Sequence, residues 1–235
     1  AGKIWSAVKV SAPLMLMAEL VIYFVSVPLG ILCAVFRGSV ADRLTTLGLF
    51  LLYSIPPFVA GMLFLLFLCY GDFLALFPML GLHSDGAAHF GPFRYLLDYL
   101  WHAFLPVTCL SLFSLAGMAM YSRTAMLDVV GQDYIRTARA KGLSERRVVS
   151  RHALKNAALP LVTLIGLDLP FLLAGAVVTE RIFAWPGMGR LFIESFERAD
   201  IPVMMTILML LCVLVVVFQI LTDIVYTWFD PRIRY

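Results

Sequence analysis

Five long apolar runs, separated by polar connections, decide what this chain can fold into. Crossing ~30 Å of hydrocarbon as a helix takes about 20 apolar residues, and lipid offers no hydrogen-bond partner to a bare backbone. Only 14% of the residues are charged, against about 25% in soluble domains. We therefore predict an all-α fold, a polytopic membrane helix bundle that forms one transmembrane domain over residues 1–235. The predicted spans are residues 13–36, 44–70, 103–121, 157–178 and 202–228.

The distribution of Lys and Arg predicts the orientation. Twelve of the 18 lie in residues 37–43, in residues 122–156 and after residue 228. Cytoplasmic connections carry an excess of these residues, so we place those three segments and the C-terminus in the cytoplasm. The net charge of +3 then reflects topology, and we expect no nucleic-acid partner.

The connection over residues 122–156 contains eight Lys and Arg and carries most of the functional signal. Asp133 is placed to cap a short helix, and Gly142 can adopt the left-handed conformation that ends one. A second helix would then begin. One face of the first helix is expected to press against another protein or anionic lipid, while a solvated positive loop is the alternative. That face comprises Tyr134, Ile135 and Ala138.

Residues 133–160, DYIRTARAKGLSERRVVSRHALKNAALP, resemble the cytoplasmic coupling segment, or EAA loop, of bacterial ABC-importer permeases. The resemblance is to the oligopeptide/dipeptide/nickel family, B-type subunit. Gly142 and Ala138 match the family pattern, whereas Arg136 and Thr137 replace the Glu-Ala pair, a departure typical of B-type members. Further resemblance comes from SIPPF at 54–58, FAWPGMG at 183–189 and FDPRIRY at 229–235.

The resemblance implies the type I ABC-importer permease fold in a bacterial inner membrane and import of peptides, with nickel as an alternative cargo. It implies two cytoplasmic ABC ATPase subunits, a second permease of the C type and an extracytoplasmic substrate-binding protein as partners. B-type members usually open with one more transmembrane helix, which we expect to be missing before residue 1; the alternative is cleavage after a signal that resembles a helix. The implied ATPase-coupling residues are Asp133, Tyr134, Arg136, Ala138, Arg139, Lys141, Gly142 and Leu143.

The chain has no recognisable catalytic motif. It contains no G-x-x-x-x-G-K-[ST] phosphate loop, no H-E-x-x-H and no G-x-S-x-G, and these carry ATP, zinc and nucleophile chemistry. We therefore expect a transport subunit that is not an enzyme and binds no cofactor, with ATP and Mg²⁺ used by its partners. The alternatives are a stand-alone secondary transporter or channel, for which no internal repeat is evident, and an intramembrane enzyme.

Polar positions inside the apolar runs indicate a route for cargo. Glu19 and Asp168 interrupt two runs, and an ionised group in lipid costs at least about 2.5–3.5 kcal/mol. They should face protein or water, and a bond to a neighbouring helix would explain them equally well. Prolines such as Pro28, Pro56, Pro57 and Pro170 are expected to bend or open helices. The predicted pathway residues are Glu19, Ser54, Pro56, Pro57, Thr163 and Asp168.

Two external segments complete the prediction. Residues 71–102 carry enough aromatic and aliphatic side chains to form short helices at the membrane interface. The spacing of His83, His89 and His102 matches no compact ligand motif, so no metal site is predicted. In the resembling family, the region of residues 179–200 docks the binding protein or closes the outer gate.

Overall fold

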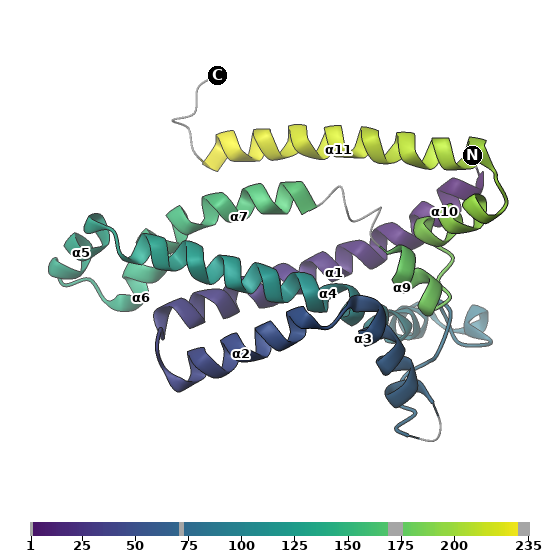
Figure 1. The fold of residues 1–235 in the computed structure, drawn as a ribbon, viewed down its shortest axis with the longest axis horizontal. Helices are drawn as coiled ribbons and strands as arrows, with labels where there is room; N and C mark the ends of the chain where they lie inside the picture. Colours follow the sequence, from purple (N-terminus) through teal and green to yellow (C-terminus); the bar gives the residue numbers. More distant parts are fainter. Residues whose placement is uncertain (1, 71–72, 169–175, 230–235) are drawn as a thin grey trace. The chain divides into compact units, whose positions relative to one another are not determined.

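The computed structural model describes residues 2–70, 73–168 and 176–229 (Figure 1). Every regular element in those ranges is helical, which confirms the all-α prediction. The α-helices are α1 (Gly2–Val35), α2 (Val40–Ser54), α3 (Pro57–Phe64), α4 (Pro92–Val130), α5 (Asp133–Ala140), α6 (Glu145–Arg147), α7 (Leu154–Asp168), α9 (Val177–Ile182), α10 (Met188–Glu197) and α11 (Ile201–Phe229). Two π-helices, η1 (Leu65–Cys69) and η3 (Val148–Ala153), and a 3₁₀ turn, η2 (Ala87–His89), complete the set.

Three of the described helices are long and apolar enough to cross a membrane, namely α1, α4 and α11. The pair formed by α2 and α3 with η1 makes a fourth span if the broken pair counts as one. The break falls at Ile55 and Pro56, just before Pro57 begins α3, as expected, because proline lacks the N–H that would continue the preceding helix. The remaining predicted run, residues 157–178, lies only partly within the described residues, and Pro170 lies outside them.

Two expectations about helix boundaries are wrong. Residues 92–102 form the first turns of α4 and not separate interfacial helices, because Pro92 is pre-set for the first helical position and no break follows it. The helix also continues through Pro106. Pro28 was expected to bend or open a helix; α1 runs without a break from Gly2 to Val35, so the helix does not open there, and a bend at Pro28 stays a prediction.

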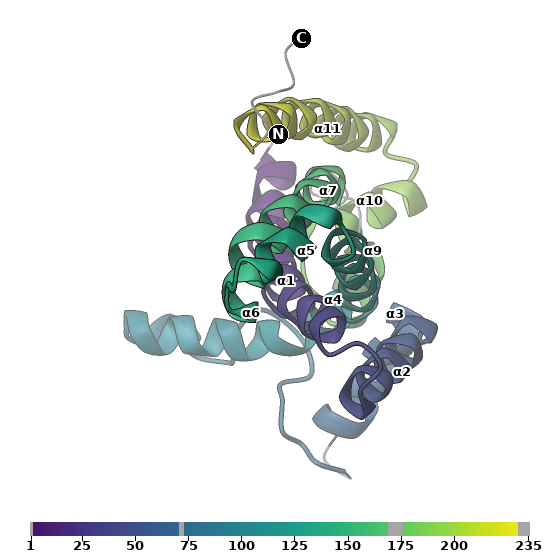
Figure 2. The same cartoon turned by 90° about the vertical axis from the view of Figure 1, so that its left-hand side faces the viewer.

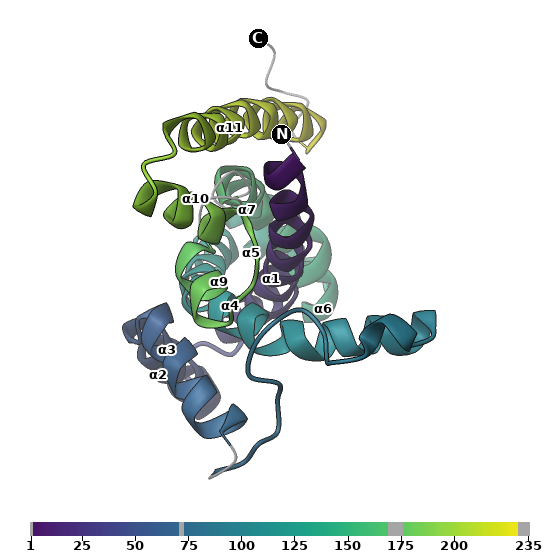
Figure 3. The same cartoon turned by 90° about the vertical axis from the view of Figure 1, so that its right-hand side faces the viewer.

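The chain forms two compact units, and each is described by itself. Unit 1 comprises Ala1–Val21, Ser54–Phe113 and Phe171–Val213. Its main core surrounds Phe183 and Trp185, which are fully buried against Leu14 and Ala103. Figure 3 shows α9 and α10 of this unit next to the beginning of α1.

Unit 2 comprises Ile22–Tyr53, Ser114–Pro170 and Leu214–Tyr235. In this unit the short helices α5 and α6 lie at the ends of α1 and α4 (Figure 2). Small side chains allow the helices to approach closely here, and they include Ala34, Ala116, Ala119, Ala153 and Ala157. Residues 122–156, which the sequence analysis predicts to be the coupling segment, lie entirely in unit 2.

Candidate functional site: the coupling segment and its anchorage

The beginning of α5 differs from the sequence prediction. Gln132, with an extended backbone, occupies the N-cap position, and no side chain caps the helix. Asp133 is therefore the first helical residue and not the cap; its side chain is 97% exposed and lies 3.6 Å from Arg136 Nη1. A carboxylate in the first turn still interacts favourably with the helix dipole. The prediction that Asp133 caps the helix is wrong by one position.

The end of α5 is as predicted. Gly142 has φ of +77°, and its N–H donates to the Arg139 carbonyl at 2.9 Å. Glycine adopts this left-handed conformation without steric cost. A second helix, α6, begins at Glu145. The turn therefore folds the chain back within a few residues.

An ion pair closes this turn. Arg139 Nε and Nη2 donate to the two carboxylate oxygens of Glu145 at 3.1 and 2.6 Å. These hydrogen bonds lower the pKa of Glu145 below its usual value. Both side chains are partly exposed, so the pair orients the turn more than it stabilises the fold.

The buried face of α5 is narrower than predicted. Ile135 and Ala138 are buried and pack with Met126 and Ala34 in one cluster. Tyr134 was expected on the same face, yet it is 44% exposed. Adjacent residues of a helix point about 100° apart, which turns Tyr134 towards Asn156; the amide of Asn156 donates to the tyrosine hydroxyl at 2.9 Å.

The opposite side of α5 presents cations. The Arg136 side chain is 74% exposed, and Lys141 is also exposed. Leu143 is half-buried against the cluster that holds Ile135. The helix thus has one face fixed to its own unit and one charged face open to a partner.

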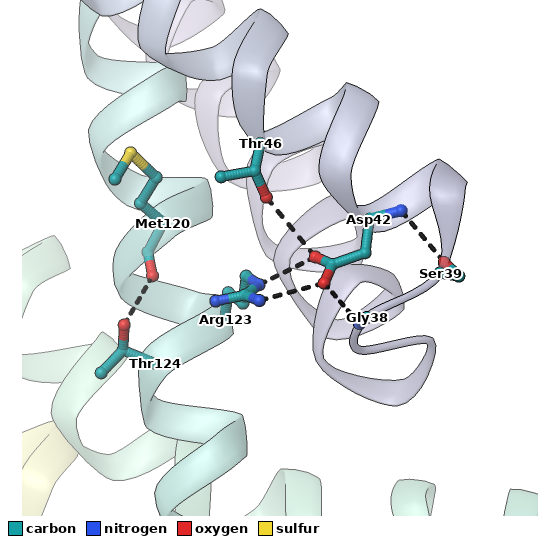
Figure 4. Close-up of polar contacts among 7 residues, drawn as sticks. All are labelled: Gly38, Ser39, Asp42, Thr46, Met120, Arg123 and Thr124. Atoms are coloured by element: carbon teal, nitrogen blue, oxygen red, sulfur yellow. Dashed lines mark hydrogen bonds and ion pairs between the residues drawn. The ribbon is translucent and has the colours of Figure 1, made fainter.

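An ion pair with a buried carboxylate holds α4 where the coupling segment begins (Figure 4). Asp42 in α2 is only 4% exposed and accepts hydrogen bonds from Arg123 Nε at 3.0 Å and Nη2 at 3.1 Å. The Gly38 N–H donates to the same carboxylate at 2.9 Å, and Thr46 Oγ1 does so at 3.4 Å. Bidentate pairs of this kind fix orientation as well as distance.

The sequence analysis missed this pair, although one local signal marks it. Ser39 and Asp42 have the spacing of a capping box before an apolar run. Ser39 Oγ accepts from the Asp42 N–H at 3.1 Å, as that motif requires. The Asp42 carboxylate bonds to the Gly38 N–H instead of to that of Ser39. Nothing local could indicate Arg123, which lies 81 residues away.

Helices α1 and α4 approach each other closely at the same level. A Cβ on Gly30 would lie 2.4 Å from the Ala119 carbonyl oxygen and 2.8 Å from the Arg123 nitrogen. Real Cβ atoms essentially never come that close. Ser122 Oγ also donates to the Val27 carbonyl at 3.3 Å. Only glycine fits at residue 30 without moving one of the two helices.

The predicted pathway residues fall into two groups. Glu19, Ser54, Pro56 and Pro57 belong to unit 1; Glu19 is largely buried in α1 and the other three are exposed. Thr163 and Asp168 belong to α7 in unit 2, and their side chains lie outside the described part. The shared pathway therefore stays a prediction.

In unit 1, a second buried carboxylate holds the FAWPGMG motif. Glu180 in α9 accepts hydrogen bonds from Ser11 Oγ in α1 and from the Arg190 N–H at the start of α10. Ser11 Oγ in turn accepts from the Met188 N–H at 2.7 Å. Burial raises the pKa of Glu180 above its usual range. A Cβ on Gly187 would require this carboxylate to move. A Cβ on Gly189 would lie 2.5 Å from the Val177 Cα, a backbone atom, so Gly189 is the glycine of the motif that is required sterically.

Two of the three histidines, His83 and His102, lie near the same carboxylate, that of Asp98. His83 Nδ1 lies 3.0 Å from Asp98 Oδ2, and His102 Nδ1 lies 3.7 Å from Asp98 Oδ1. His89 is not bonded to either in the contacts of the described chain. Among the described residues, no three His, Cys, Asp or Glu side chains are grouped to hold a metal ion.

Comparisons with known proteins agree on the family. Residues 26–235 match the family described as "Binding-protein-dependent transport system inner membrane component". The oligopeptide transport system permease protein AppB of Bacillus subtilis (strain 168) is 40% identical over 222 residues, which are 94% of this chain and 68% of that protein. The dipeptide transport system permease protein DppB of Escherichia coli (strain K12) is 40% identical over 226 residues, 90% of this chain and 66% of that protein.

The chain also matches the glutathione transport system permease protein GsiC of Escherichia coli (strain K12), with 37% identity over 88% of this chain and 62% of that protein. It thus spans about two thirds of the length of these relatives. A chain of the MetNI methionine ABC transporter in an inward-facing conformation shares the fold, with a TM-score of 0.70. The match covers 97% of this chain and 96% of that chain at 18% identity.

Proposed function

Because the chain belongs to the family of binding-protein-dependent transport system inner membrane components, we propose that it is a permease subunit of an ATP-driven ABC importer for di- and oligopeptides. The family membership confirms the resemblance inferred from the sequence, and it assigns the chain to the multi-pass proteins of the inner membrane. The peptide cargo is proposed because AppB and DppB are named as oligopeptide and dipeptide permeases.

The two-faced helix α5 is the observation that carries the coupling role. Its apolar face, with Ile135 and Ala138, is fixed to unit 2, while Arg136 and Lys141 are exposed. A partner that pushes on the charged face would move the cluster to which the other face is bound. This arrangement suits a helix that receives motion from outside the chain.

We propose the following partners and architecture. Two cytoplasmic ABC ATPase subunits bind the coupling segments, and they alone use ATP and Mg²⁺. A second permease of the C type completes the pathway, and an extracytoplasmic binding protein delivers the peptide. Five spans of the type I fold are proposed for this chain, with the C-terminal residues 230–235, which lie outside the described part, in the cytoplasm.

The proposed pathway is bordered by Glu19, Ser54, Pro56, Pro57, Thr163 and Asp168. In a bundle this apolar, polar side chains and helix breaks mark the places where water is tolerated. Peptides differ widely in their side chains, so we propose a wide, weakly selective cavity. Specificity would then rest with the external binding protein.

Purification of the chain with its partners tests the proposal. The full-length protein, expressed with the neighbouring transporter subunits, should co-purify with two ATPases and a second permease. In proteoliposomes the complex should hydrolyse ATP faster when binding protein and tri-alanine are added, and it should accumulate labelled tri-alanine. Uptake of nickel chloride without tri-alanine would favour the nickel alternative. Transport of tri-alanine by the chain without any ATPase would refute the proposal in favour of a secondary transporter.

A further inference from the structure

We propose that Asp42 and Arg123 are positioning residues of the coupling mechanism, and that their ion pair joins α2 rigidly to the helix that carries the coupling segment. The inference rests on the proposed function. It assigns a role to two residues that lie outside α5 and outside the proposed pathway.

The geometry of the pair restricts relative motion. Both oxygens of the Asp42 carboxylate are occupied by Arg123, and the Gly38 N–H and the Thr46 hydroxyl add two further bonds. The guanidinium is planar and presents its donors as a rigid fork, so it resists both sliding and rotation of α2 against α4. A lysine would supply the charge without the second fixed contact.

The first helix is attached at the same place. Gly30 of α1 meets the Ala119 carbonyl oxygen and the Arg123 nitrogen with no room for a side chain, and Ser122 is bonded to Val27. Close-packed interiors transmit displacement because they have little free volume. We refer to Gly30, Asp42, Ser122 and Arg123 as the cytoplasmic joint, where α1, α2 and α4 are held together.

Arg123 of the joint lies one helical turn from Met126, the residue of α4 that packs against α5. Met126 is three residues after Arg123 on α4, and a helix repeats every 3.6 residues. Met126 is fully buried and belongs to the cluster that contains Ile135 and Ala138 of α5. A push on α5 therefore reaches α4 at Met126 and arrives at Arg123 within a turn. The ion pair extends that displacement to α2, and α2 leads along the chain to the break at Pro56.

Without the pair, apolar packing would still connect α2 to α4 here, through a cluster that includes Leu49, Leu52, Leu115, Ala116, Ala119 and Met120. Such packing is non-directional, so it fixes the relative orientation of the two helices less firmly than the bidentate pair does. We expect a complex lacking the pair to assemble and hydrolyse ATP, but to convert fewer ATPase cycles into import.

The test compares four versions of the assembled complex in proteoliposomes with binding protein and labelled tri-alanine. They are the wild type, Asp42→Asn, Arg123→Lys and the control Arg43→Gln. Arg43 is an exposed cation on the same turn of α2 as Asp42, so its loss changes the local charge by one unit, in the opposite sense to Asp42→Asn, and leaves the joint intact. The measured quantity is tri-alanine imported per ATP hydrolysed, at equal amounts of purified complex.

We expect Asp42→Asn to lower the import-to-hydrolysis ratio at least about 5-fold, the lower end of coupling between sites. Arg123→Lys should lower it by a smaller factor, because it keeps the charge and loses the fork. Arg43→Gln should match the wild type. A fall in hydrolysis and import together, with an unchanged ratio, would overturn the proposal.

Loss of assembly in both Asp42→Asn and Arg123→Lys would assign the pair to folding alone and would also overturn it. Failure of the proposed function gives a different result, because the wild-type complex itself would then not import tri-alanine. In that case both proposals fall. Normal wild-type import with normal ratios in every variant would remove only the joint.

Discussion

Replacement of Gly30 by alanine is the sharpest test of the close contact between α1 and α4. The added Cβ would lie 2.4 Å from the Ala119 carbonyl oxygen and 2.7 Å from the Ser122 Cβ, whereas ordinary contact begins at 3.4 Å. Both neighbours are firmly held, one as backbone and one at its Cβ. The helices would therefore have to separate by roughly 1 Å, and overpacking of this kind costs about 1–3 kcal/mol.

A matched substitution isolates that cost. Gly48 lies in α2 of the same unit, and the Cβ that alanine would add there has open space beyond the backbone of its own helix. Alanine stabilises a helix interior by about 0.5–1 kcal/mol relative to glycine. Gly48→Ala should therefore be neutral or stabilising, and Gly30→Ala should be destabilising despite the same gain in helix propensity.

Thermal unfolding of the purified chain in detergent measures the difference. A change of 1 kcal/mol shifts Tm by about 2–4 °C for a protein of this size. Gly30→Ala should therefore melt several degrees below Gly48→Ala. If the two variants melt together, α1 and α4 are not in tight contact at this level, and the cytoplasmic joint loses one of its three helices.

Three further predictions concern the coupling segment and the hydrogen bonds of Glu180. Gly142→Val should abolish binding-protein-stimulated ATP hydrolysis while the chain stays in the membrane. The added Cβ meets open space, so the cost of about 1–3 kcal/mol comes from the left-handed backbone. Normal stimulation of ATP hydrolysis in this variant would show that the turn is not needed. Lys141→Ala should weaken ATPase binding only mildly in co-purification, since exposed pairs contribute about 0–1 kcal/mol, and loss of the complex would reveal a buried partner. Burial raises the pKa of Glu180 above its ordinary 4.5, so the folded state binds the proton more tightly and stability falls as the pH rises from that value through the raised pKa. Glu180→Gln should remove this slope in Tm measured between pH 4.5 and neutral, and a slope that persists would place its origin elsewhere.

The features that could be predicted from the sequence are those set by nearby residues. Gly142 ends α5 because a glycine between two helical patterns has few other roles, and the break at Pro56 follows from proline chemistry alone. Apolar length predicted the spans α1, α4 and α11. The beginning of α4 was missed because Pro92 begins a helix that hydrophobicity alone does not distinguish from an interfacial segment.

The contacts that could not be predicted join distant parts of the chain. Asp42 and Arg123 are 81 residues apart, and Ser11 and Glu180 are 169 apart. The capping-box spacing places Asp42 in the first turn of a helix, but nothing near either carboxylate in the sequence indicates its distant partner. Tyr134 was misplaced for a different reason, since helical periodicity gives a broad apolar stripe and only tertiary packing decides its edges.

The π-helix η3 lets the coupling segment absorb a change in length that a regular α-helix could not. A π-turn closes over one more residue than an α-turn, and η3 lies between α6 and α7, with Val148 and Ala153 buried in the cluster around Met126. Deleting an exposed residue of η3, such as Ser150, can therefore restore an ordinary α-turn and leave Ala157 on the face that it now occupies. Deleting one residue from the start of α7 itself would instead advance every later residue by about 100° of helical rotation. Single deletions should therefore be tolerated in η3 and not in α7, where they would present a different face of that helix to the rest of its unit.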